Sequence, residues 1–191
     1  MSTKTLTPQQ IYRKKADGLP INPGDETLVQ RHVISVLLEN QSGSLNRVLN
    51  MFAARGFNLE SVAVGETEDP SVSRLTLATS GNTKVIRQIL RQLNRLVETL
   101  EVTDLNDADY VEREICLIRV RAMANQRSEL KDTLEMFEGK VVDITAETLM
   151  FEVTGPTKKI KALIHVLTPY GILDVARSGR VALARPLIHG D

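Results

Sequence analysis

The sequence predicts an α+β protein made of two tandem βαββαβ units, and three observations support this prediction. Apolar residues alternate between strand spacing and helical spacing in one fixed order along residues 31–106. The same order starts again after residue 107. Residue identities also repeat, since "LNMF" (Leu49 to Phe52) matches "LEMF" (Leu134 to Phe137) and Asn40-Gln41 matches Asn125-Gln126. A duplicated unit explains all three observations.

In the first half, strands are predicted where β-branched and other apolar residues form short runs bounded by turn residues. These strands cover residues 32–38, 57–66, 72–80 and 97–105, with "TEDPS" as the hairpin between the second and the third. Helices are predicted at 44–55, where Leu45, Val48, Leu49 and Phe52 share a face, and at 82–93. Gly56 stands where a left-handed residue would end the first helix.

The second half repeats this order, with strands predicted at residues 113–123, 140–147, 149–155 and 172–183 and helices at 128–138 and 158–167. Each unit is therefore predicted to be a ferredoxin-like sandwich, a four-stranded antiparallel sheet with two helices on one face. The other face, which alternates Val, Leu, Ile and Ala, would be left bare. Because an exposed apolar sheet face or edge is normally covered, we expect halves or subunits to pair, forming a homodimer.

Composition excludes several classes of protein. Lys plus Arg number 24 and Asp plus Glu number 24, so the chain lacks the basic excess of a dedicated nucleic-acid binder. Residues 1–30 contain no apolar segment typical of a secretory signal, and no run is long enough to span a membrane. We expect residues 1–30 to be a partly disordered extension. The single Cys116 lies in the apolar run "ICLIRV", which indicates a buried thiol and a reducing, cytoplasmic setting.

The junction between the first strand and the first helix differs between the halves. It contains Asn40, Gly43 and Ser44 in the first half, against Asn125, Ser128 and Glu129 in the second. Glycine lets the backbone approach a ligand closely, and the N–H groups of a first helical turn attract a carboxylate or phosphate. We expect the first half to keep an anion pocket. In the second half, the carboxylate of Glu129 would repel an anion at the same place. The alternative is a simple helix-start turn capped by Ser42.

Two other classes of function find little support. The three histidines, His32, His165 and His189, are scattered, and no nucleophile-base set, dinucleotide-binding fingerprint or P-loop is present, so no catalytic residue and no metal ligand is predicted. An RNA-recognition domain shares the βαββαβ order but needs aromatic residues on its sheet face. The first and third strands have none, and Phe151 stands alone in the second unit.

A family resemblance appears on these same residues. The stretch "ISVLLENQSGSLNRVLNMFAARGFNLESVAVGETEDPSVSRLTL" resembles the N-terminal ACT domain of the acetolactate synthase (acetohydroxyacid synthase) small regulatory subunit. The similarity continues through "LVETLEVTDL", "YVEREICLIRV", "VVDIT" and "VARSGRVALAR" and covers residues 31–185. It implies an effector-binding ACT domain at residues 31–106 and an ACT-like, ferredoxin-like domain at 107–191.

The resemblance implies a protein that does no catalysis. Such a subunit activates a large catalytic subunit, which carries thiamine diphosphate, FAD and Mg²⁺, and it confers feedback inhibition by valine or another branched-chain amino acid. No cofactor is then expected in this chain. ACT domains pair, with the effector at the pairing interface. The alternative is an ACT-type regulator of a different enzyme. The similarity of residues 111–185 to the small subunit's second domain argues against this alternative.

The resemblance also implies a site. The family's valine-response positions fall on Asn40, Gly43 and Asn58. Main-chain N–H groups near Gly43 and Ser44 would hold the effector's carboxylate, and an amide oxygen of Asn40, or of Asn58 across the interface, would accept from its ammonium group. Leu37 and Leu38 adjoin this junction, and Leu38 is the residue we expect to line a slot for the effector's side chain. Asn58 could equally be an ordinary turn residue after Gly56.

Overall fold

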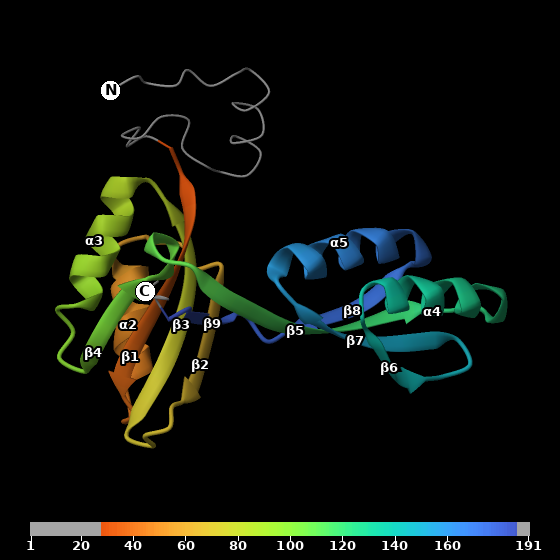
Figure 1. The fold of residues 1–191 in the computed structure, drawn as a ribbon, viewed down its shortest axis with the longest axis horizontal. Helices are drawn as coiled ribbons and strands as arrows, with labels where there is room; N and C mark the ends of the chain where they lie inside the picture. Colours follow the sequence, from red (N-terminus) through yellow and green to blue (C-terminus); the bar gives the residue numbers. More distant parts are fainter. Residues whose placement is uncertain (1–27, 187–191) are drawn as a thin grey trace, which may run out of the picture. The chain divides into compact units, whose positions relative to one another are not determined.

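The structure is a computed structural model that describes residues 28–186, in which the chain separates into two compact units divided between Asp109 and Tyr110 (Figure 1). Each unit is an antiparallel sheet with two helices packed on one face, so the predicted α+β class with two ferredoxin-like βαββαβ units is confirmed. Apart from residues 28–30, the predicted N-terminal extension lies outside the described residues.

The first unit has the sheet order β2-β3-β1-β4. Its elements are β1 (Gln30–Glu39), α2 (Ser44–Ala54), β2 (Ser61–Glu66), β3 (Val72–Gly81), α3 (Thr83–Leu93) and β4 (Thr99–Asp104), followed by a 3-10 turn at Leu105–Asp107. Alternate residues of β1, namely Ile34, Val36 and Leu38, face the helices and are fully or almost fully buried. Because β2 lies at one edge of the sheet, its outer backbone groups have no neighbouring strand within the unit.

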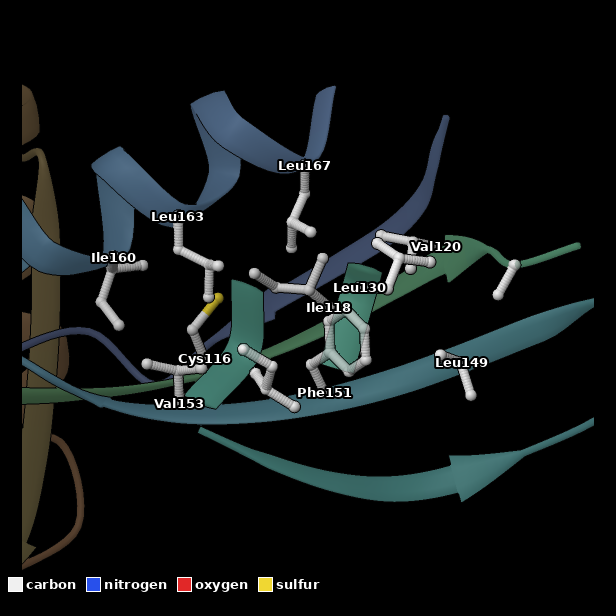
Figure 2. Close-up of a cluster of buried hydrophobic side chains, with 12 residues drawn as sticks. Cys116, Ile118, Val120, Leu130, Leu149, Phe151, Val153, Ile160, Leu163 and Leu167 are labelled. Atoms are coloured by element: carbon white, nitrogen blue, oxygen red, sulfur yellow. The ribbon is translucent and has the colours of Figure 1, made fainter. Parts of the chain in front are cut away.

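The second unit has the equivalent order β6-β7-β5-β8, with a further strand, β9, paired to the first part of β5. Its elements are β5 (Tyr110–Arg121), η2 (Ala124–Gln126), α4 (Arg127–Met136), β6 (Lys140–Ile144), β7 (Thr148–Gly155), α5 (Thr157–Leu167), η3 (Thr168–Tyr170), β8 (Ile172–Arg177) and β9 (Val181–Ala184). Figure 2 shows its core, in which Cys116, Phe151 and Leu163 are fully buried between the sheet and the helices.

The duplication is real, but the residue matches that first indicated it are out of register. The cross-strand pairs Ile34–Asp104 and Cys116–Arg177 hold the same place in the two sheets, each followed by a bulge in the same position. Backbone hydrogen bonds continue this register through both junctions and both helix ends. The equivalent pairs are Asn40 with Ala122, Gly43 with Asn125, Ser44 with Gln126, Phe52 with Leu134 and Gly56 with Glu138.

Matching Asn40 to Asn125, Gly43 to Ser128 and "LNMF" to "LEMF" was therefore wrong by three residues. That error is close to one helical turn of 3.6 residues, so an apolar helical pattern matches almost as well after the shift. The correct register places buried Val48 opposite buried Leu130.

Several predicted element bounds also need correction. The strand predicted at 57–66 starts at Ser61, because Phe57 instead turns back to meet Phe52 edge-to-face at a ring-centroid distance of 6.0 Å. The strand predicted at 140–147 ends at Ile144, and the helix predicted at 128–138 occupies Arg127–Met136. The last predicted strand, 172–183, is two strands, β8 and β9. They are separated by residues 178–180, where Gly179 adopts a φ of 78°.

The sheet faces that point away from the helices are more polar than expected. In the first unit, successive cross-strand pairs on this face are Val33–Ala78, Ser35–Thr76 and Leu37–Arg74. Arg74 lies across the face, and its Nη1 donates to Ser35 Oγ at 2.9 Å. In the second unit the corresponding face holds a shallow hollow lined by Leu117, Arg119, Met150, Asp174 and Ala176. Neither face is the uniformly apolar surface that the alternation of residues predicted.

Candidate functional site

The first strand-helix junction places a helix start next to the edge of the sheet. β1 ends at Glu39, and α2 begins at Ser44 with Gly43 as its N-cap residue. Gly43 has a φ of 94°, a conformation that glycine adopts without strain. No side chain caps this helix, so the alternative of a cap by Ser42 is wrong, and the first turn contains no acidic residue. The positive end of the helix dipole is left open to a ligand.

Beside this helix start lies a hollow of about 290 Å³ between the end of β1, the first turn of α2 and the end of β2. It is lined by Leu38, Glu39, Asn40, Gln41, Ser44, Leu45, Val64, Gly65, Glu66 and Ser73. Two of these residues are acids and none is basic. Ser44 is only 5% exposed, and its Oγ has no hydrogen-bond partner among the described residues. A buried hydroxyl without a partner is unfavourable unless a ligand or water satisfies it.

The side chain of Asn40 reaches from the junction to the turn between β2 and β3. Its Nδ2 donates to the main-chain oxygen of Pro70 at 2.9 Å and to Glu66 Oε1 at 3.2 Å. Both amide hydrogens are therefore in use, and neither partner can donate in return when the carboxylate is ionised. Oδ1 accepts no hydrogen bond from the described residues and remains available as an acceptor.

The structure brings together some of the predicted site residues and separates others. Leu38, Asn40 and Ser44 line the hollow, and Gly43 directly precedes Ser44. Asn58 lies at the opposite end of the sheet, where its main-chain oxygen accepts from Thr79 Oγ1 at 2.6 Å. Within one copy of the chain, Asn58 therefore cannot share a ligand with Asn40.

Sequence reasoning missed the contribution of β2, namely Val64, Gly65 and Glu66. The strand itself was predicted from its alternating residues. The signal that could have found these residues is the hairpin, because antiparallel pairing with β3 places the end of β2 beside the end of β1.

Two groups that an enzyme could use, His32 and Cys116, are engaged or buried, whereas His165 on α5 is exposed. His32 Nδ1 lies 2.7 Å from Asp104 Oδ2. Burial raises the pKa of the Cys116 thiol to about 11, which leaves it protonated and poorly nucleophilic at neutral pH. Within residues 28–186, no group of three or more His, Cys, Asp or Glu side chains could hold a metal ion, and no helix is long and apolar enough to cross a bilayer.

The second unit does not present an aromatic surface for stacking RNA bases. Phe151 is completely buried and belongs to the core beneath α4 and α5, so it does not lie on the open sheet face (Figure 2). RNA recognition by this fold depends on aromatic side chains on that face.

Comparison with known proteins agrees with the two-unit fold. Residues 34–101 match the family model described as AHAS small subunit-like ACT domain, and residues 113–186 match the one described as small subunit of acetolactate synthase. The chain is thus a regulatory protein built on an ACT domain.

The similar proteins agree with the family models. The chain is 43% identical over 155 residues to the probable acetolactate synthase small subunit of Archaeoglobus fulgidus, covering 81% of this chain and 97% of that protein. It is 42% identical over 156 residues to the acetolactate synthase isozyme 3 small subunit of Escherichia coli, covering 81% and 96%. The crystal structure of the small subunit from Thermotoga maritima superposes with a TM-score of 0.75 at 38% identity, covering 83% of this chain and 99% of that one. The chain belongs to the acetolactate synthase small subunit family.

Proposed function

We propose that this chain raises the turnover of a separate acetolactate synthase catalytic subunit and makes that enzyme sensitive to valine or another branched-chain amino acid. The thiamine diphosphate, FAD and Mg²⁺ of the reaction would reside on the catalytic subunit, in the cytoplasm. The observation that carries the proposal is the hollow beside the uncapped start of α2, with the unpartnered Ser44 Oγ buried in its wall.

Each part of an amino acid has a counterpart in this hollow. The Ser44 N–H donates to the main-chain oxygen of Gln41 at 3.2 Å, so the next N–H groups of α2, those of Leu45 and Asn46, and the Ser44 hydroxyl are left to donate to a carboxylate. Asn40 Oδ1 can accept from an ammonium group. Leu38, Leu45 and Val64 offer apolar surface for a short branched side chain. The arrangement suits a small zwitterion with an aliphatic side chain better than it suits a phosphate ester.

The same proposal explains why Asn58 lies far from Asn40. The strand β2 is the edge of its sheet, and Val64 on it is 50% exposed. If two copies pair β2 to β2 about a two-fold axis, the strands run antiparallel and the start of one faces the end of the other. Asn58, just before the start of β2, would then approach the partner's hollow at the end of its β2.

The role is tested first by measuring turnover. The purified chain supplied with pyruvate, thiamine diphosphate, FAD and Mg²⁺ should form no acetolactate, and it should raise the turnover of its cognate catalytic subunit. The complex should then be inhibited by valine. Appreciable turnover by the isolated chain, or no effect on the catalytic subunit, would reject the proposed role.

The pairing is tested by mixing two variants in which the valine response is weakened. Gly43→Asp blocks carboxylate binding in the hollow of the copy that carries it. Asn58→Ala removes the side chain that its copy would place in the hollow of the partner copy. Each variant alone should respond weakly to valine, whereas statistical mixing in a two-fold dimer should restore about a quarter of the sites. A mixture that binds no more valine than either variant alone would place Asn58 outside the site, and sedimentation of the chain only as a monomer at micromolar concentration would exclude the paired arrangement.

A further inference from the structure

The charge of the hollow differs from what a carboxylate ligand alone would require. The carboxylates of Glu39 and Glu66 line it, and no Lys, Arg or His side chain does. The helix dipole alone contributes about 0.3–1 kcal/mol, and no cationic side chain in the lining of this hollow adds to it. Two acids beside the helix start would repel a ligand that carries only a negative charge.

Glu66 also fixes the side-chain amide of Asn40, another residue of the lining. Its Oε1 receives one hydrogen of the Asn40 amide, and the Pro70 carbonyl receives the other. Since neither of these oxygens donates, the amide cannot turn over without losing both bonds, and Oδ1 keeps its direction. Glu39, the other acid, accepts from Gln41 Nε2 at 2.7 Å and is not a hydrogen-bond partner of the Asn40 amide. The two acids thus have different roles.

We infer that Glu66 makes the hollow select ligands that carry a free ammonium group, by supplying negative charge at its rim and by holding Asn40 Oδ1 as an acceptor. Glu66 is a positioning residue that acts through Asn40, and its charge discriminates an amino acid from the 2-oxo acid with the same carbon skeleton. The two ligands share a carboxylate and a side chain, and they differ only where Glu66 and Asn40 act. This inference rests on the proposed function, because it concerns the same hollow.

The test compares the affinities of L-valine and 3-methyl-2-oxobutanoate for the full chain by isothermal titration calorimetry. The wild-type protein should bind valine at least about tenfold more tightly, since a charge-assisted hydrogen bond is lost with the oxo acid. Glu66→Gln should weaken valine binding about fivefold, and leave the affinity for the oxo acid unchanged or slightly raised. The ratio of the two affinities should therefore fall, which a general loss of folding would not produce.

Glu68→Gln is the matched control, because it removes the same charge from an exposed position in the same turn between β2 and β3. It should leave the ratio of the two affinities unchanged. Glu66→Asp keeps the charge, so its ratio should lie between those of Glu66→Gln and the wild type. If Glu66→Gln and Glu68→Gln lower the ratio equally, or if Glu66→Gln does not lower it, the inference is overturned while the valine site stands. If the wild-type chain binds no branched-chain amino acid, the proposed valine response falls together with this inference.

Discussion

The junction after β1 and the junction after β5 occupy the same place in the same fold, and they use their polar groups in different ways. In the first, Gly43 starts the helix without a side-chain cap, and the buried hydroxyl of Ser44 has no partner among the described residues. In the second, the equivalent of Ser44 is Gln126, whose Oε1 accepts from the Met123 N–H at 3.3 Å. The chain enters α4 through a 3-10 turn, with no left-handed residue.

A guanidinium group occupies the second junction. Arg127, the equivalent of Leu45, donates to the main-chain oxygens of Ala122 and Ala146, the latter at 2.7 Å. Glu129, in the same first turn of α4, is also engaged, since its hydrogen bond with the hydroxyl of Tyr170 raises the pKa of that tyrosine. The second junction therefore satisfies its polar groups within the chain, whereas the first leaves the Ser44 hydroxyl without a partner among the described residues, as the proposed effector site requires.

The largest expected effect concerns the ion pair of the second sheet, and it extends the comparison from the junctions to the strands. The Glu114 side chain is 2% exposed, and both its oxygens receive bonds from Arg177, at 2.6 and 2.7 Å, and one also from the Thr157 hydroxyl. Glu114→Gln would leave a guanidinium group without its counter-charge, and we expect a loss of about 3 kcal/mol in the free energy of unfolding. Urea denaturation followed by circular dichroism measures it.

The matched change is His32→Gln, because His32 and Asp104 hold the equivalent positions in the first sheet. There a single hydrogen bond joins the two side chains, so the expected loss is about 1 kcal/mol. Equal losses in the free energy of unfolding for the two variants would show that the bidentate contact of Arg177 with Glu114 adds no stability to the second sheet.

Arg127→Met tests whether the second junction serves stability alone. The substitution keeps an unbranched apolar stem but leaves the carbonyls of Ala122, Thr145 and Ala146 without their donor, and we expect a loss of about 2 kcal/mol. Valine inhibition of the complex should be unchanged. Lys131→Met is the control on the same helix, since its exposed pair with Glu135 at 3.7 Å is worth less than about 0.5 kcal/mol. Loss of the valine response in Arg127→Met at full folding would assign the second junction a part in regulation.

The fold followed from the sequence to a large extent because its strands and helices have different periods. The duplicated order and the burial of Cys116, Val48 and Phe52 needed no structure. The residue register of the repeat could not be obtained in this way, since a helical pattern shifted by about one turn presents nearly the same face. Only the pairing of β1 with β4 and of β5 with β8 identifies Asn125, rather than Ser128, as the equivalent of Gly43.

The residues of the candidate site that are close in sequence could be predicted, and those that are distant in sequence could not. Leu38, Asn40 and Ser44 are close in sequence, at the end of β1, in the loop that follows and at the start of α2, and local patterns place them together. Glu66 reaches the same hollow through the hairpin between β2 and β3, a contact between distant parts of the sequence. Its role depends on the direction of one amide group, which no residue pattern encodes.

The last pair of substitutions tests the comparison most directly, because it introduces the same charge at equivalent places in the two junctions. Gly43→Asp adds a carboxylate beside the helix start, where the carboxylate of the effector should bind. We expect at least a tenfold weaker valine response, or about 1.4 kcal/mol, from repulsion and from the strain of a non-glycine residue at a φ of 94°. Titration of valine against the activity of the complex measures the response.

Two variants separate the causes. Gly43→Ala introduces the strain without the charge, and since a Cβ there meets no atom within 4 Å, it should weaken the response much less than the aspartate does. Asn125→Asp places the same carboxylate in the second unit, where Gln126 and Arg127 already satisfy the junction, so valine should inhibit that complex as it inhibits the wild type. Activation of the catalytic subunit should persist in all three, because neither core is altered. If Asn125→Asp abolished the valine response while Gly43→Asp preserved it, the effector would bind in the second unit, and the open junction of the first would be only a helix start.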